Sequence, residues 1–159
     1  MPKNDKTSVM RILDREGIAY TARTYELTGE RSGTAAAAAM GVDPAAVYKT
    51  LVTVGASGRN YVFVVPASAE LDLKKAAKSV GEKSIEMIKQ KELLPLTGYI
   101  HGGCSPIGMK KLFPTTVDSS AETRDTIIFS AGKLGHQVEL CPEDLGKVIP
   151  INFSDICQR

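Results

Sequence analysis

The spacing of apolar residues near the start of the chain predicts a helix followed by a strand. Val9, Ile12 and Leu13 recur on one helical face, and Gly17 follows as a stop. The run IAYTARTYEL then alternates and carries β-branched and aromatic side chains, which favours a strand. Beyond a loop, TAAAAAMG predicts a short helix with Thr34 as its N-cap.

Longer apolar runs predict strands at the centre of a sheet. The segment VYKTLVTV follows a helix start at Asp43 and Pro44 and favours a strand over residues 47–54. YVFVV is apolar throughout, as buried central strands are. LDLKKAAKSVG predicts a helix that is capped by Asp72 and stopped by Gly81.

Short mixed elements are expected in the second half of the chain. A strand and a helix should lie between residues 83 and 94, and CPEDLGKVI predicts a late helix that begins at Pro142. Further strands are expected near residues 98–101, 115–118, 126–130 and 137–140. Because strands and helices mix without a strict βαβ repeat, we expect an α/β (α+β) fold with a mixed, curved or barrel-like sheet surrounded by helices. The length predicts one domain over residues 1–159.

Composition narrows the classes of function. The chain is 43% hydrophobic and 24% charged, as ordinary globular proteins are. Aromatic residues make up 6% and there is no Trp, which argues against a single-stranded nucleic-acid binder built on stacking. Three cysteines without a CxxC pair argue against a disulfide framework or a zinc knuckle. The polar start MPKNDKTSVM and the lack of a long apolar run lead us to expect a cytoplasmic protein without membrane, metal or cofactor.

Positive charge gathers in one part of the chain. Residues 74–111 hold eight Lys and three Glu, a net charge of +5, although the whole chain carries only +2. Such asymmetry is typical of an anion-binding face, but solvated surface lysines produce it as well.

The glycine-rich stretch TGYIHGGCSPIGMKK is a first candidate site. It has neither a GxxxxGK[ST] nor a GxGxxG pattern, so Walker-type and dinucleotide binding are not expected. Its glycines would let backbone amides approach an anion or a polarised carbonyl, or they would form a tight turn fixed by Ser105 and Pro106. His101 and Cys104 lack the further ligands that a metal needs, which leaves a Cys–His nucleophile pair or simple packing of the thiol.

Lys49 and Ser130 are two further candidates. Lys49 interrupts an apolar strand, where a charge costs free energy unless it meets solvent or a partner. It either faces outward from a half-exposed strand or points a cation into a cleft, where it would pair with phosphate or a developing oxyanion. Ser130, before AGKLG, is either a polar group at a strand end or a turn cap. Spacing alone identifies no Ser/His/Asp triad.

Several ordered motifs resemble one known family. VYKTLV, LDLKKAAKSVG, TGYIHGGCSPIG, the lysine pair after it and SAGKLG occur in the order typical of the YbaK/EbsC family, and the resemblance runs from about Val9 to Ile156. Its members are aminoacyl-tRNA deacylases related to the editing domain inserted in bacterial prolyl-tRNA synthetases. The resemblance implies trans-editing, in which a wrong amino acid, cysteine or alanine, is released from mischarged proline tRNA. It also implies a mixed, barrel-like α/β fold without a metal.

The resemblance further implies a set of site residues. The family's key functional lysine corresponds to Lys49, with Thr50 beside it, and the tyrosine after the first helix corresponds to Tyr25. The loop that shapes the aminoacyl pocket and the serine of the later turn correspond to Gly102, Gly103, Ser105, Pro106, Gly108 and Ser130.

A few departures from the family pattern bear on which amino acid is removed. Where this chain has Ser32, cysteine-specific members tend to carry the Phe of an NFG motif. They often carry Asp at the position of Gln137, and aliphatic residues are common at the positions of His101 and Cys104. Cys-tRNA(Pro) is the expected substrate, and Ala- or Ser-charged tRNA is the alternative within the class. A non-catalytic module that binds tRNA or a synthetase is the alternative outside it.

The implied chemistry explains why no protein triad is needed. An aminoacyl ester is already activated, so its cleavage requires an oxyanion partner and a positioned nucleophile rather than a strong protein base. In cysteine-specific members the substrate's own thiol is thought to attack its carbonyl. Lys49 would hold the terminal phosphate or ribose, or neutralise the oxyanion, and loop amides would polarise the carbonyl. Lysines of residues 74–111 would steer the tRNA acceptor end, and prolyl-tRNA synthetase is a candidate partner.

Overall fold

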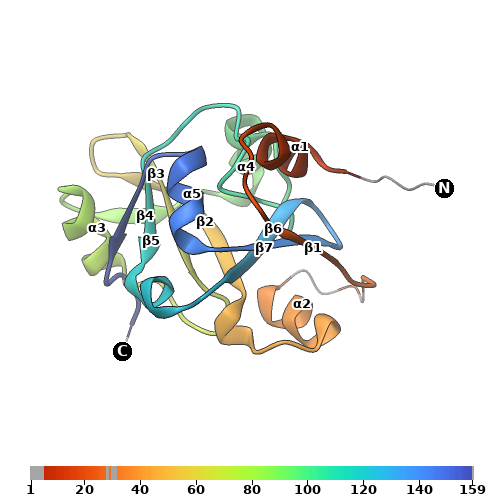
Figure 1. Ribbon diagram of the computed structural model, residues 1–159. Coiled ribbons are helices and arrows are strands. Elements are labelled where there is room, and N and C mark those ends of the chain that lie inside the picture. Colours follow the sequence, from red (N-terminus) through yellow and green to blue (C-terminus); the bar gives the residue numbers. More distant parts are fainter. Residues whose placement is uncertain (1–5, 28, 30–31, 159) are drawn as a thin grey trace.

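Two sheets that meet along a seam form the framework of the protein (Figure 1). The computed structural model describes residues 6–27, 29 and 32–158. The strands in these residues are β1 (Thr21–Thr24), β2 (Tyr48–Gly55), β3 (Asn60–Pro66), β4 (Ile85–Met87), β5 (Thr115–Asp118), β6 (Ile127–Lys133), β7 (His136–Leu140) and β8 (Ile151–Ser154). The first sheet is antiparallel in the order β1-β7-β6. The second has the order β4-β2-β3-β5-β8, with antiparallel pairs up to β3 and parallel pairs beyond it.

Short helices surround the two sheets (Figure 1). They are α1 (Ser8–Arg15), α2 (Gly33–Met40), α3 (Leu73–Val80), α4 (Gln90–Thr97) and α5 (Pro142–Val148), with short 3₁₀ helices at Pro44–Ala46 and Ser119–Thr123. α3 is capped as predicted, because Asp72 accepts hydrogen bonds from two backbone amides of the first turn and Gly81 ends the helix in the left-handed conformation. In the part of the chain that the structure describes, no helix is long and apolar enough to cross a membrane.

The two sheets share one hydrophobic core and touch at one bridge. Val47, directly before β2, forms a parallel bridge with Ile128 of β6. Val52 of the second sheet, Phe129 of the first and Leu13 of α1 belong to the same buried cluster, each with 2% or less of its surface exposed. Burial of this shared core holds β2 and β6 against each other at the seam.

The expected α/β (α+β) class is confirmed, and the strands form two sheets rather than a closed barrel. The prediction of a strand near residues 98–101 is wrong. Gly98 ends α4 in the left-handed conformation and Gly102 takes a second left-handed turn, so the backbone between them does not stay extended.

Three further details differ from the sequence-based expectations. The N-cap of α2 is Ser32 instead of Thr34, and its Oγ accepts a hydrogen bond from the Ala35 amide at 3.1 Å. The first strand covers only residues 21–24, since the chain leaves the sheet after its last pair with β7. The strand β8 was not predicted, because its pairing with β5 is a contact between distant segments.

Candidate functional site

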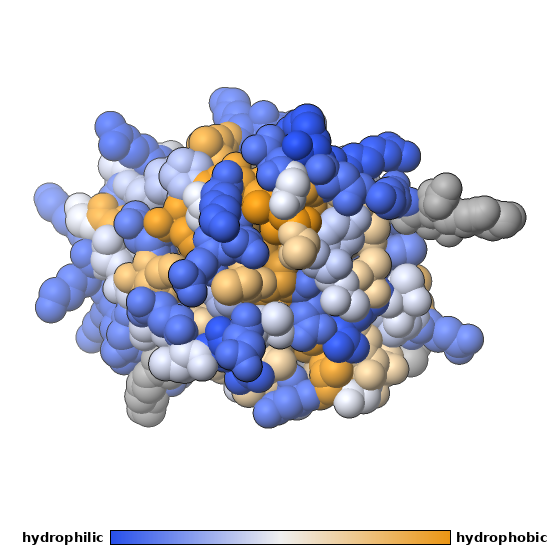
Figure 2. Space-filling model, in the orientation of Figure 1, coloured by the Kyte–Doolittle hydropathy of each residue, from blue (hydrophilic) through white to orange (hydrophobic). Residues whose placement is uncertain are grey.

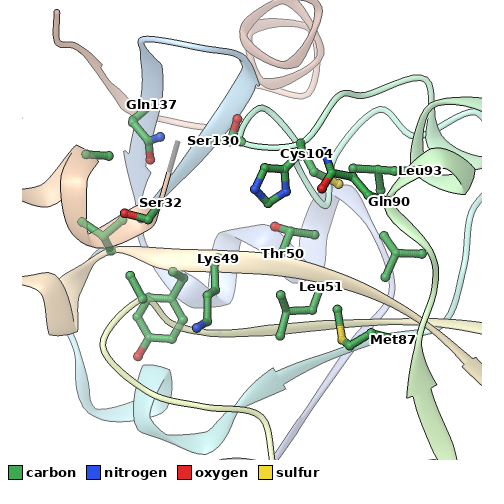
Figure 3. Close-up of a pocket in the computed structure, with 18 of the residues that line it drawn as sticks. Ser32, Lys49, Thr50, Leu51, Met87, Gln90, Leu93, Cys104, Ser130 and Gln137 are labelled. Carbon is green, nitrogen blue, oxygen red and sulfur yellow. The ribbon is translucent and has the colours of Figure 1, made fainter. Parts of the chain in front are cut away.

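A cavity of about 490 Å³ opens where β2 and the first sheet diverge (Figure 3). Beyond the Val47–Ile128 bridge, no further pairing joins β2 to β6 among the described residues. The cavity is lined by the start of α2, by β2, by the segment from β4 to α4, by the glycine-rich loop and by the β6–β7 hairpin. The sequence marked β2 at Lys49, the glycine-rich loop and Ser130 as candidates, whereas it did not mark the segment from β4 to α4.

One edge of β2 runs along the cavity. β2 pairs with β3 over residues 48–54 but with β4 only over residues 53–55, which leaves its middle without a strand partner on the second edge. The Ala67 amide donates to the Val47 carbonyl, so the odd-numbered residues of this strand bond toward β3. In an antiparallel ladder the alternate residues turn their groups the other way, and the N–H and C=O of Thr50 therefore face the open edge.

Lys49 is half-buried in the cavity wall. Among the described residues, no ion pair or hydrogen bond engages its ammonium group. Figure 3 shows the side chains of Lys49 and Thr50 leaving β2 on opposite sides, as the two-residue period of a strand requires. Both line the same cavity, so the charge of Lys49 lies at a cleft rather than on a flat outer face.

Two buried polar atoms of the cavity wall have no hydrogen-bond partner. They are Thr50 Oγ1 and Gln137 Oε1. A buried polar group without a partner costs about 1–3 kcal/mol, and such groups are uncommon in folded proteins. In a cavity wall, a bound molecule that supplies the partner removes this cost.

Tyr25 and Ser130 also line the cavity. Tyr25 directly follows β1, and its amide donates to the Gly135 carbonyl at 3.1 Å, which ties it to the β6–β7 hairpin. Ser130 lies opposite Gln137 in the hairpin, and its Oγ accepts a hydrogen bond from the Gly132 amide at 3.0 Å. Ser130 therefore lines the cavity and also shapes the turn.

The glycine-rich loop turns tightly and presents His101, Gly102 and Cys104 to the cavity. Gly102 has a φ of 89°, which a residue with a side chain rarely adopts. The Gly103 amide donates to the Ile100 carbonyl at 3.0 Å, so it is occupied within the turn. The loop therefore forms a tight turn, which is one of the two alternatives that the sequence left open, and it also contributes to the cavity wall.

Four of the site residues implied by the family lie outside the cavity wall. Gly103, Ser105, Pro106 and Gly108 are not among the residues that line it. The buried Ser105 accepts a hydrogen bond from an amide two residues further on. A Cβ at Gly108 would lie 2.8 Å from the hydroxyl oxygen of Tyr99. In this structure these residues shape the loop behind the wall.

The environment of Cys104 disfavours a thiolate. Burial raises the pKa of the Cys104 thiol to about 12, so it is protonated at neutral pH. A nucleophilic cysteine needs the opposite shift. In the described ranges, no group of three or more His, Cys, Asp or Glu residues could hold a metal ion.

Sequence reasoning missed the apolar side of the cavity. It is formed by Leu51, Met87, Ile88 and Leu93, next to Gln90. Only the pairing of β4 with the end of β2 brings this segment to the cavity, and no motif marks it. Met87 is 47% exposed, and Figure 2 shows apolar residues scattered among hydrophilic ones on the face that it draws.

The sequence matches the aminoacyl-tRNA editing domain family over residues 30–148. It is 42% identical over 157 residues to the Enterococcus faecalis protein named "Putative Cys-tRNA(Pro)/Cys-tRNA(Cys) deacylase EbsC", with 97% of this chain and 94% of that protein covered. The chain therefore belongs to the aminoacyl-tRNA editing domain family. The resemblance to the YbaK/EbsC family is confirmed as well.

Two solved structures share the fold. A hypothetical protein, 22% identical, matches with a TM-score of 0.87 over 96% of this chain and all of its own. A structure titled "putative trans-editing enzyme for prolyl tRNA synthetase", 24% identical, matches with a TM-score of 0.80 over 96% of this chain and 99% of its own. At these identities the agreement concerns the fold alone.

Proposed function

We propose that this protein is an aminoacyl-tRNA deacylase that acts in trans, and that it releases cysteine from mischarged tRNA(Pro). The observation that carries the proposal is a cavity whose wall holds Lys49, which has no partner among the described residues, together with unsatisfied polar atoms and a protonated cysteine. Such a wall suits a substrate that is already activated and needs positioning. Family membership and the name of the Enterococcus relative support the same class of reaction.

In the proposed reaction, the protein positions the aminoacyl ester at the 3′ end of tRNA. The ammonium of Lys49 neutralises the charge that develops on the carbonyl oxygen, or holds the phosphate of the terminal adenosine. A cation in a half-buried cleft is effective in either role, because water screens it less than on an open surface. Tyr25 and Ser130 contact the same bound end of the tRNA.

The substrate supplies the nucleophile when the amino acid is cysteine. Its thiol sulfur attacks its own carbonyl carbon, a C–S bond forms, and the ester C–O bond breaks. The thiol proton passes to the departing ribose oxygen, so the products are a thiolactone and tRNA with a free 3′ hydroxyl. A protein nucleophile is not required, which agrees with the raised pKa of Cys104. Without a substrate thiol, water attacks and the enzyme is a simple hydrolase.

The exposed lysines at the start of α4 favour docking of the acceptor end near the cavity. Lys89 and Lys91 flank Gln90, which lines the cavity, and both are exposed. Such cations pair with tRNA phosphates and make binding dependent on salt. We place the reaction in the cytoplasm, where tRNA is charged, with prolyl-tRNA synthetase as a partner that supplies the substrate.

A panel of tRNA(Pro) charged with Cys, Ala, Ser or Pro tests the proposal. Purified protein should release cysteine fastest and leave Pro-tRNA(Pro) intact, with and without EDTA in the buffer. Faster release of alanine or serine would move the specificity to that amino acid. If the protein binds the charged tRNAs but cleaves none of them, it is a tRNA-binding module and not an enzyme. A loss of activity in EDTA that zinc restores would contradict the metal-free mechanism.

A further inference from the structure

The cavity has a cationic side and a side that accepts hydrogen bonds. The described residues that line it include no Asp or Glu, so no carboxylate there would pair with a ligand's cation. Gln137 is only 5% exposed, its Oε1 has no partner, and its side chain points into the cavity (Figure 3). Thr50 Oγ1 is the second unpaired oxygen.

The two unpaired oxygens lie apart from the lysine. In Figure 3, Thr50 and Gln137 lie on one side of β2 and the ammonium of Lys49 lies on the other. The backbone of Thr50 adds a carbonyl to the accepting side, because its C=O faces the open edge of β2. A ligand with one anionic and one cationic group would therefore bind with its anion near Lys49 and its cation toward Gln137.

The α-ammonium of an aminoacyl group has the chemistry that the accepting side needs. It carries three N–H donors on one charged nitrogen, and each good acceptor within reach forms a charge-assisted hydrogen bond. We propose that Gln137 Oε1 binds this α-ammonium and so fixes which way the aminoacyl group enters the cavity. The inference rests on the proposed function for its substrate, and it makes Gln137 a determinant of binding rather than of bond cleavage.

Binding of a ligand that cannot be cleaved tests the inference apart from catalysis. The probe is a 5′-phosphorylated adenosine whose 3′ oxygen is replaced by NH, linked as an amide to cysteine. A matched probe carries an α-hydroxyl in place of the α-ammonium. Gln137→Met keeps the length of the side chain and removes the acceptor oxygen. Calorimetry should show that this change weakens binding of the ammonium probe about 10- to 100-fold, as the loss of a hydrogen bond to a charged group predicts. It should weaken the hydroxyl probe less than about threefold, since that group is uncharged.

Two more variants complete the design. Gln137→Glu keeps an acceptor oxygen and adds a negative charge, so it should restore or strengthen binding of the ammonium probe. Gln90→Met changes the same residue type on the other side of the cavity and should shift both probes equally. Equal losses for both probes in Gln137→Met, no loss for either, or failure of the wild-type protein to bind the ammonium probe would overturn the inference. Tight binding without cleavage of any charged tRNA would instead reject the proposed function and leave the ammonium site in place.

Discussion

The hydroxyl of Tyr99 donates a hydrogen bond to the carbonyl of Ile107 across the glycine-rich loop, with 2.5 Å between the two oxygens. Burial raises the pKa of Tyr99 to about 12, so the hydroxyl keeps its proton at neutral pH. A Cβ at Gly132 of the β6–β7 hairpin would lie 2.9 Å from the Tyr99 ring. Tyr99 therefore connects two walls of the cavity.

Tyr99→Phe should destabilise the protein and slow its reaction. The change leaves the buried carbonyl of Ile107 without its partner, which costs about 1–3 kcal/mol. The thermal midpoint should fall by several degrees, and deacylation should slow because the loop is held less firmly. Tyr61→Phe is the control, since its hydroxyl bonds to the half-buried Glu82 outside the cavity. Unchanged stability in Tyr99→Phe would contradict this role.

Gly33 is required by the close approach of α2 to the end of β3. A Cβ at this position would lie 2.7 Å from the Cβ of Ala67, and both atoms are fixed to the backbone. Gly33→Ala should therefore cost about 1–3 kcal/mol in unfolding free energy, as overpacking does. Adding Ala67→Gly removes the clash, so the double variant should be more stable than Gly33→Ala alone. Urea unfolding measures the stability of Gly33→Ala, of Ala67→Gly and of the double variant. If the stability changes of the two single variants simply add up in the double variant, the contact is refuted.

Lys49→Ala should remove the activity and preserve the fold. Loss of a charge that stabilises the reacting group costs ~3 kcal/mol or more, about a hundredfold in rate. Lys49→Arg keeps the charge but replaces a compact ammonium with a wide guanidinium, so we expect partial recovery at best. Single-turnover deacylation of Cys-tRNA(Pro), with thermal melts alongside, measures both effects. Lys147→Ala, on the exposed face of α5 and outside the lysine-rich segment 74–111, is the control. A folded Lys49→Ala protein with the wild-type rate would exclude Lys49 from the mechanism.

Cys104 should contribute to stability in a pH-dependent way without acting as a nucleophile. Its pKa in the folded protein, about 12, lies above the ordinary value of 9.0. Between these values the unfolded chain has lost the thiol proton and the folded protein has kept it. Its contribution is therefore full below pH 9 and is lost as the pH rises toward 12. The free energy of unfolding, measured with urea, should fall more steeply above pH 9 for the wild-type protein than for Cys104→Ala.

The same variant tests the chemistry. Cys104→Ala should keep appreciable turnover, and iodoacetamide at pH 8 should label the half-buried Cys141 before Cys104. Mass spectrometry of the digested protein locates the label. A trapped acyl group on Cys104 during the reaction would show that the cysteine takes part after all.

Local patterns in the sequence determined most of the helices and strands. α3 begins after its N-cap Asp72 and ends at Gly81, and α5 begins at Pro142. These limits could be predicted because a cap acts on backbone groups only a few residues away. The apolar run of β3 likewise required burial on both faces. The ordered motifs were also enough to identify the family, since they occur at matching places along nearly the whole chain.

The cavity was decided by tertiary structure. It exists because β2 meets β6 at Val47 and Ile128, 81 positions apart, and then diverges from it. That divergence leaves the edge of Thr50 open and brings Gln137, on the far side of the hairpin, to the same space. No pattern along the chain encodes such a meeting, because pairing between distant strands depends on how the shared core packs. The sequence could therefore mark Lys49 as unusual, but only the fold shows which polar atoms of the same cavity wall lack partners.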